Sequence, residues 1–199
     1  MYDWEAKSDA RSLMREIRAR HPRLRDAVAA DARVTLFHRS ERHGLNPGTD
    51  TLQAVLRLLW VDDAFLAQVL YRLKARLQAL RVPVLPRLTH HLAVLTGQVS
   101  IGDPVVVHPG CCLLHGQVVI DGFVEIHPGV VIGPFVTIGL RSGDVIGPTI
   151  EREVKIGTGA KVLGNLRVGA GATIGANAVV VDDVEPGATV VGAPARPKA

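Results

Sequence analysis

The sequence predicts an α+β protein in which an α-helical N-terminal segment, residues 1–98, precedes a parallel β-helix of hexapeptide repeats, residues 99–199. Two patterns and one feature of the composition support this prediction. Apolar residues follow a helical period in the first half, and aliphatic residues recur at every sixth position in the second. The chain also combines 20 glycines with only 4% aromatic residues. A core made of many small, similar side chains is typical of a repeat architecture.

The apolar spacing of the first half predicts three or four helices between about residues 7 and 95. One apolar series follows Asp50, and a second begins at Asp63 and ends before Pro83 and Pro86. Asn46-Pro47-Gly48 predicts a break between helices. The apolar positions of the two series are Leu52, Val55, Leu56, Leu59 and Trp60, then Phe65, Leu66, Val69, Leu70, Leu73, Leu77 and Leu80.

The second half predicts the β-helix, because a helix would not tolerate its glycines and an ordinary strand has a period of two. Each hexapeptide supplies one short strand and a turn, and three of them close one coil. The aliphatic register has one gap, at Asp144, and predicts four to five coils in which Ile120, Ile138, Ile156 and Ile174 stack. Its members are Ile120, Ile126, Ile132, Ile138, Ile150, Ile156, Val162, Val168, Ile174 and Val180, with Ile101, Val107 and Leu113 upstream of one inserted residue.

Composition and charge exclude several classes of protein. Cys111 and Cys112 are the only cysteines and are adjacent, which excludes a disulfide scaffold and a four-cysteine zinc site and favours a reducing compartment. No apolar stretch is long enough to span a membrane, and the N-terminal residues do not resemble a signal peptide. We therefore expect a cytoplasmic protein with no membrane partner.

The positive charge is confined to the first half. Residues 1–98 hold 16 Lys and Arg against 10 Asp and Glu, whereas residues 99–199 hold 7 against 9. The basic residues are scattered among helical patterns without interleaved aromatics, which is typical of a solvated face or a subunit contact. We expect no nucleic-acid partner.

The segments IGTGAKVLGNLRVGAGATIGANAVVVDDVEPGATVVGAPAR and LLHGQVVIDG resemble the hexapeptide-repeat acyltransferases, close to serine O-acetyltransferase and its shorter sugar-acetylating relatives. The resemblance covers about residues 65–197. It implies a left-handed β-helix and a homotrimer, with a dimer of trimers through the helices left open. It also implies acetyl-CoA as co-substrate, lying in a groove between neighbouring prisms.

The resemblance assigns His115, in Leu113-Leu114-His115-Gly116, as the catalytic general base. An alcohol must lose a proton as it attacks a thioester, and imidazole has a suitable pKa for accepting it. The same resemblance assigns the coenzyme to backbone groups of late coils and to one cation for a phosphate; these residues are Gly139, Gly157, Thr158, Gly175, Ala176 and Arg196. The alternative is that the glycines only make turns and that His115 fills a corner.

The chain departs from the serine-acetyltransferase pattern at several positions. Ser100 stands where the family has the aspartate that orients the histidine, and Leu114 replaces an acidic residue that the serine enzymes use on substrate. Ile146 and Gly147 stand where a loop arginine and a second histidine bind the serine carboxylate; Arg141 is the candidate substitute cation. The expected acceptor is therefore a small hydroxyl compound, either a serine-like amino acid or a sugar, and the loss of these charge-assisted contacts disfavours free zwitterionic serine. A catalytically inactive trimeric scaffold or binding protein is the alternative.

Two further expectations concern partners. Serine enzymes often carry a tail that docks into cysteine synthase; this sequence ends Arg196-Pro197-Lys198-Ala199, so no such complex is expected. His108, His115 and His127 have the wrong spacing for the metal site of β-helical carbonic anhydrases, so no metal is expected.

Three other features of the sequence support specific predictions. The two His-Pro-Gly segments at 108–110 and 127–129 predict matching corner turns, and the cysteine pair predicts a buried corner. Glu125 and Asp121 are the nearest acids to His115 in sequence, and either could orient it.

Overall fold

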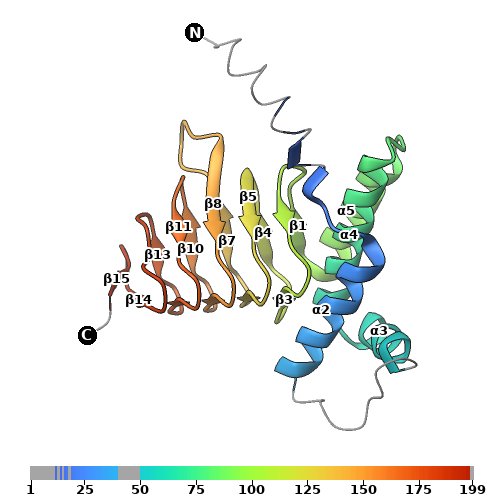
Figure 1. Cartoon of the computed structure of the whole chain (residues 1–199), viewed down its shortest axis with the longest axis horizontal. Coiled ribbons are helices and arrows are strands. Elements are labelled where there is room, and N and C mark those ends of the chain that lie inside the picture. The colour runs from blue at the N-terminus through green and yellow to red at the C-terminus, as the bar shows by residue number, and fades with distance from the viewer. Residues whose placement is uncertain (1–11, 13, 15, 18, 40–49, 198–199) are drawn as a thin grey trace.

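A computed structural model describes residues 12, 14, 16, 17, 19–39 and 50–197, and it shows helices followed by a parallel β-solenoid (Figure 1). The helices with defined bounds are α2 (Leu24–His38), α3 (Asp50–Val61), α4 (Asp63–Ala79) and α5 (Leu85–Gly97). They confirm the predicted helical segment. The predicted break at Asn46-Pro47-Gly48 lies outside the described residues. No described helix is long and apolar enough to cross a membrane.

The solenoid has three sheets that run along its length, here called sheets A, B and C. Sheet A contains β1 (Val99–Ile101), β4 (Val118–Ile120), β7 (Thr137–Gly139), β10 (Lys161–Leu163) and β13 (Val179–Val180). Sheet B contains β2 (Val106–Val107), β5 (Phe123–Ile126), β8 (Ile146–Ile150) and β11 (Arg167–Val168). Sheet C contains β3 (Cys112–Leu113), β6 (Val131–Ile132), β9 (Lys155–Ile156), β12 (Thr173–Ile174), β14 (Thr189–Val191) and β15 (Arg196–Pro197). The chain passes from A to B to C, so the turns form three edges: A–B, B–C and C–A.

The hexapeptide register fills the interior as predicted, but one predicted stack is wrong. Ile120 pairs with Ile138, and Ile138 then pairs with Val162 rather than with Ile156. Ile156 lies on sheet C, between Ile132 and Ile174. The reason is the gap at Asp144: an aspartate occupies the register position at which the other hexapeptides bury an aliphatic residue, so this segment leaves the prism as an exposed loop between β7 and β8. Every later strand is thereby moved by one sheet.

Helix α4 covers the open end of the solenoid at the first coil. Gln68 donates to the Cys111 carbonyl at 2.9 Å, Tyr71 to the Val105 carbonyl at 2.8 Å, and Lys74 to the Ile101 carbonyl. Arg72 donates to the carbonyls of Val107 and His108. These strand-end carbonyls would otherwise be unpaired, so α4 acts as the cap that a solenoid needs at its first repeat.

The Arg72 guanidinium is itself held by the carboxylate of Asp31 in α2. Their closest N–O distance is 2.9 Å, and both side chains are buried. Asp31 also accepts hydrogen bonds from the backbone N–H groups of Gly110 and Cys111. The change from helix to strand falls between Gly97 and Val99. That residues 1–98 and 99–199 form two separate domains stays a prediction.

Candidate active site

His115 lies on the C–A edge, in the turn that joins β3 to β4, and its side chain is exposed. This turn carries the one residue inserted into the repeat. Its backbone is tied to the end of α5: Gln117 N–H donates to the Gly97 carbonyl at 3.3 Å, and Val118 N–H donates to the Gln98 carbonyl at 3.2 Å. A Cβ atom on Gly116 would collide with the Gly97 carbonyl oxygen. The turn that presents His115 is thus shaped by the helical segment.

His115 opens into a cleft of about 450 Å³ between the N-terminus of α4 and the first two coils. The cleft contains Asp62, Asp63 and Arg39, besides apolar residues of both parts of the chain. Asp62 caps α4 by accepting the Phe65 N–H at 3.0 Å, and its other oxygen lies 2.9 Å from Arg39 Nη1. Within the described part of the chain, the His115 ring has no hydrogen-bond partner.

The polar residues of this cleft are not predicted from the sequence. A helix N-terminus at Asp62–Asp63 is readable from the sequence, because the apolar series begins there. Nothing in the sequence, however, shows that this N-terminus faces the His115 turn. Glu125, proposed from the sequence to orient His115, instead lies on sheet B beside His108, and Asp121 follows β4 at the A–B edge.

Four of the predicted coenzyme residues share the C–A edge with His115. Gly157 and Thr158 follow β9, and Gly175 and Ala176 follow β12, two and three coils beyond the His115 turn. Neighbouring coils lie ~4.8 Å apart, so these positions form a line along one edge. The glycines also have a purely structural role: a Cβ on Gly157 would lie 2.7 Å from the Ala176 nitrogen of the next coil.

Arg196 lies at the far end of the same edge. It belongs to β15, which pairs antiparallel with β14, and the preceding Ala195 N–H donates to the Val179 carbonyl of sheet A. Its side chain is 66% exposed, with Nη1 3.6 Å from Oδ2 of the exposed Asp182. A ligand from solution can therefore reach this cation.

Gly139 and Arg141 lie on a different edge, A–B, where the loop after β7 begins. The Arg141 side chain is exposed and packs over Gly164 of the next coil. Neither residue lines the His115 cleft of the same chain.

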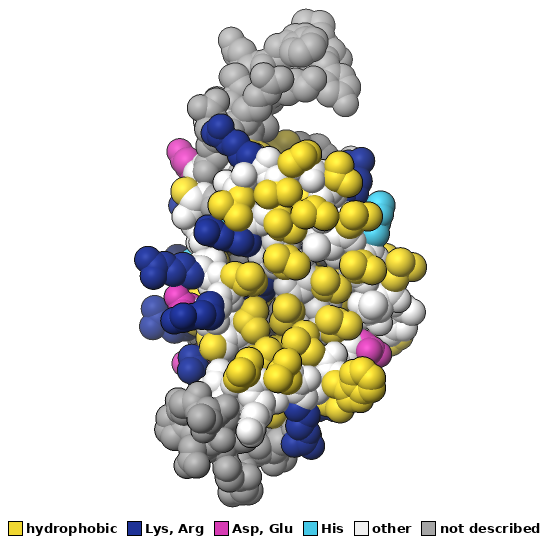
Figure 2. Space-filling view, turned by 90° about the vertical axis from the view of Figure 1, so that its right-hand side faces the viewer, with side chains coloured by type: hydrophobic (Ala, Val, Ile, Leu, Met, Phe, Trp, Pro, Cys, Tyr) yellow, Lys and Arg dark blue, Asp and Glu magenta, His cyan; other side chains and the backbone are white. Residues whose placement is uncertain are grey.

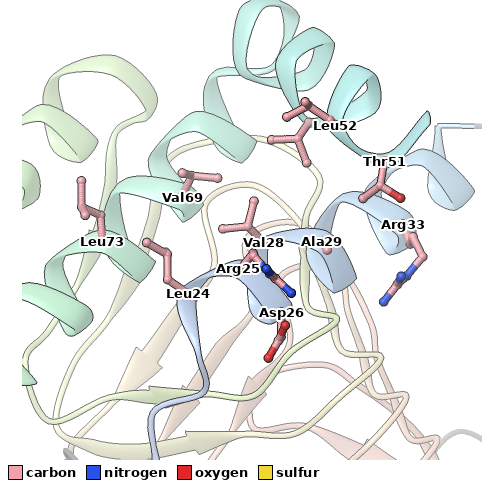
Figure 3. Close-up of a pocket in the computed structure, with 11 residues that line it drawn as sticks. Leu24, Arg25, Asp26, Val28, Ala29, Arg33, Thr51, Leu52, Val69 and Leu73 are labelled. Atoms are coloured by element: carbon pink, nitrogen blue, oxygen red, sulfur yellow. The ribbon is translucent and has the colours of Figure 1, made fainter. Parts of the chain in front are cut away.

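A larger cavity, about 720 Å³, lies among α2, α3 and α4 (Figure 3). Leu24, Val28, Val69 and Leu73 give it a mainly apolar lining, with Arg25 and Asp26 at its margin. Its described lining residues include no histidine or cysteine. The His115 cleft is the better candidate active site, because it combines a histidine with two carboxylates and an arginine.

Cys111 and Cys112 are both buried, as predicted, and both are free thiols. Burial raises the pKa of both thiols above the ordinary value, and that of Cys112 reaches about 11. They stay protonated near neutral pH and are poor nucleophiles.

The fold and the edge that carries His115 define a transferase of the hexapeptide-repeat class. Residues 147–182 match the family model described as "Bacterial transferase hexapeptide (six repeats)". Among curated proteins, the serine acetyltransferase of Synechococcus elongatus is 38% identical over 186 residues, which cover 85% of this chain and 66% of that protein. The serine acetyltransferase of Escherichia coli K12 is 41% identical over 111 residues, covering 51% and 41% of the two chains.

Solved structures agree with these sequence matches. The soybean serine acetyltransferase apoenzyme superposes with a TM-score of 0.73 at 31% identity, covering 88% of this chain and 69% of that one. A serine acetyltransferase in complex with CoA gives a TM-score of 0.76 at 26% identity, covering 94% and 75%. This chain belongs to the hexapeptide-repeat serine acetyltransferase family. It spans about two thirds of the length of the Synechococcus relative and two fifths of the Escherichia one.

Proposed function

We propose that this protein transfers an acetyl group from acetyl-CoA to a hydroxyl group of a small acceptor, with His115 as general base. The observation that carries the proposal is the exposed His115 in a cleft with charged groups, on a chain of this family.

The acceptor oxygen attacks the thioester carbonyl while His115 Nε2 or Nδ1 takes its proton. The resulting tetrahedral oxyanion is stabilised by backbone N–H groups of the C–A edge. When the carbonyl reforms, the C–S bond breaks, and the sulfur leaves with the proton returned by the imidazole. The products are an acetyl ester and free CoA, and no covalent enzyme intermediate is needed.

Acetyl-CoA lies along the C–A edge in this proposal. Its pantetheine arm contacts the backbone at Gly157, Thr158, Gly175 and Ala176, and Arg196 binds a phosphate. The support is that these residues follow His115 along one edge and that a similar structure was solved as a complex with CoA.

The site is completed by a neighbouring chain of a homotrimer. Gly139 and Arg141 are expected near the thioester and the acceptor, yet they lie on the A–B edge of their own chain. If the A–B edge of one prism meets the C–A edge of the next, these residues reach the His115 cleft of the neighbour. A trimer supplies this pairing three times.

Of the two candidate acceptors, serine matches the charged groups of the His115 cleft better than a sugar does. The loop lacks the family's carboxylate-binding cation, but Arg39 supplies a cation inside the His115 cleft, and Asp62 and Asp63 supply acids for an ammonium group. Similar structures include a serine acetyltransferase in complex with cysteine and the soybean enzyme complexed with serine. A sugar would make no use of either charge, whereas the two charged groups of a zwitterionic serine match the cation and the acids of the cleft.

The test is to replace His115 with alanine and to follow release of the CoA thiol from acetyl-CoA with serine, homoserine and sugars as acceptors. We expect kcat to fall by about 10²–10⁴-fold, with CoA affinity measured by calorimetry unchanged. His91→Ala, an exposed histidine of α5, is the matched control and should keep full activity.

Equal activity in His115→Ala would reject the base assignment. Absence of thiol release with every acceptor, together with absence of CoA binding, would favour the inactive scaffold. Faster turnover of a sugar than of serine would reject the acceptor class.

A further inference from the structure

Two histidines and one glutamate converge on the B–C edge, away from the His115 cleft. His108 and His127 begin the two His-Pro-Gly turns, which follow β2 and β5 on neighbouring coils. Because the turns share one register, the two rings stack, with their centroids 4.9 Å apart and their planes at 20°. The spacing of His108, His115 and His127 in the sequence predicts no metal site, but in the structure His108 and His127 lie beside Glu125 and not beside His115.

Glu125 points outward from β5 toward both imidazoles. Its Oε1 lies 2.8 Å from His108 Nε2 and 4.0 Å from His127 Nε2. Its Oε2 accepts a hydrogen bond from Arg20 Nη1 at 2.9 Å. One carboxylate oxygen thus faces two ring nitrogens.

We propose that His108, Glu125 and His127 bind a divalent transition-metal ion of the Zn²⁺ type. One donor atom from each residue lies within 4.8 Å of the other two. Metal–ligand bonds of ~2.0–2.2 Å place the donor atoms of a tetrahedral site about 3.3–3.6 Å apart, so the short His108–Glu125 contact must lengthen and the longer donor distances must shorten. The three side chains are 27%, 26% and 32% exposed, so they have room for that adjustment, and solution ions can reach them.

The donor set determines the kind of metal. Two imidazole nitrogens and one carboxylate oxygen suit Zn²⁺, Ni²⁺ or Cu²⁺, whereas Mg²⁺ and Ca²⁺ prefer oxygen ligands. Three protein ligands leave at least one coordination position for water. Arg20 would hold the outer carboxylate oxygen and so fix the orientation of Glu125.

The bound ion would join the first two coils at the end covered by α4. His108 belongs to the first coil, and its backbone carbonyl already accepts a hydrogen bond from Arg72 of α4. Glu125 and His127 belong to the second coil. A shared ion would therefore link the capped coil to its neighbour and stabilise this end of the solenoid against local opening.

Glu151 provides a matched comparison. Its backbone position follows β8, one coil beyond His127 on the same edge, so it is the next residue in the same register. Its carboxylate, however, is 2.8 Å from Arg167 Nη2 and belongs to a separate ion pair. Removing this acid should leave the metal site intact.

The experiment titrates ZnCl₂ into tag-free, chelator-treated full-length protein by calorimetry and adds Co²⁺ as a spectroscopic probe. We expect one Zn²⁺ per chain with micromolar affinity, and visible Co²⁺ bands of a nitrogen- and oxygen-ligated site. His127→Ala and Glu125→Gln should each weaken Zn²⁺ binding about tenfold or more. Glu151→Gln and His91→Ala should leave the affinity within about twofold of wild type.

Glu125→Gln preserves the size of the side chain, so it separates loss of a ligand from loss of fold. Zn²⁺ should raise the unfolding temperature of the wild-type protein but not that of Glu125→Gln. Wild-type protein that binds no Zn²⁺ at micromolar concentrations, or variants that bind it as tightly as wild type, would overturn the proposal. The metal site and the acetyltransferase proposal stand independently, because this readout does not use activity.

Discussion

Gly116 shows how one residue determines where the candidate base lies. Its φ is not in the left-handed region, so the need for glycine is one of space and not of backbone conformation. A methyl group there would press on the Gly97 carbonyl, the atom that anchors the turn through Gln117 N–H. The position of His115 therefore depends on the missing side chain next to it.

We expect Gly116→Ala to displace the His115 turn from the end of α5. The overpacking should cost about 1–3 kcal/mol in the free energy of unfolding, measured in urea, and should lower the rate of thiol release. Gln117→Ala, at the exposed neighbouring position, is the control for stability. A Gly116→Ala protein as stable and active as wild type would show that the turn tolerates a shift.

At the scale of elements, α4 takes the place of a preceding coil, because its side chains form hydrogen bonds with the first coil. Its polar residues are buried because they donate to carbonyl groups at the open end of the solenoid, and Arg72 links that end to Asp31 of α2. A buried ion pair is not in itself stabilising, because both charges lose hydration. Here the Arg72 and Asp31 groups also satisfy four backbone groups of the first coil.

We expect Arg72→Met to cost about 3–5 kcal/mol of unfolding free energy, because it leaves the Asp31 carboxylate buried without its cation. Arg76→Met removes an exposed arginine one turn later in α4 and is the control, with an effect below about 0.5 kcal/mol. Adding Asp31→Asn to Arg72→Met should recover part of the loss, since no unpaired charge then remains. Equal stability of the two single variants would contradict the capping role.

At the scale of the whole molecule, the helical end of the protein presents a broad apolar face. Figure 2 shows hydrophobic side chains gathered over this end, with few charges among them. Exposed residues of α3 and α5 include Leu52, Leu56, Trp60, Leu88, Leu92 and Leu95, and Trp60 is 90% exposed. Apolar patches of this kind mark interaction sites. We propose that the helical ends of two trimers cover each other.

The prediction is a mass of six chains in analytical ultracentrifugation. Leu92→Glu should reduce it to three chains, because a buried unpaired carboxylate opposes association. Glu185→Lys, a charge reversal at an exposed position far along the solenoid, should leave the mass unchanged. A Leu92→Glu protein that still sediments as six chains would place the contact between trimers elsewhere.

The sequence by itself determined the helical segment, the parallel solenoid and the residues on its edges. The hexapeptide period alone is enough to predict the solenoid, because each buried aliphatic position, such as Ile126 or Ile132, repeats the same local environment. It also indicated the loop at Asp144, but not that the loop would move Ile156 from one sheet to another.

Only the tertiary structure decided which polar groups meet. Asp62 and Arg39 are far from His115 in sequence, and their approach depends on how α4 docks against the first coil. Glu125 is ten residues from His115 yet faces another edge, because side chains six residues apart lie on different sheets of the prism. Local periodicity fixes the face on which a residue lies, whereas contacts between distant segments depend on the packing of the whole chain.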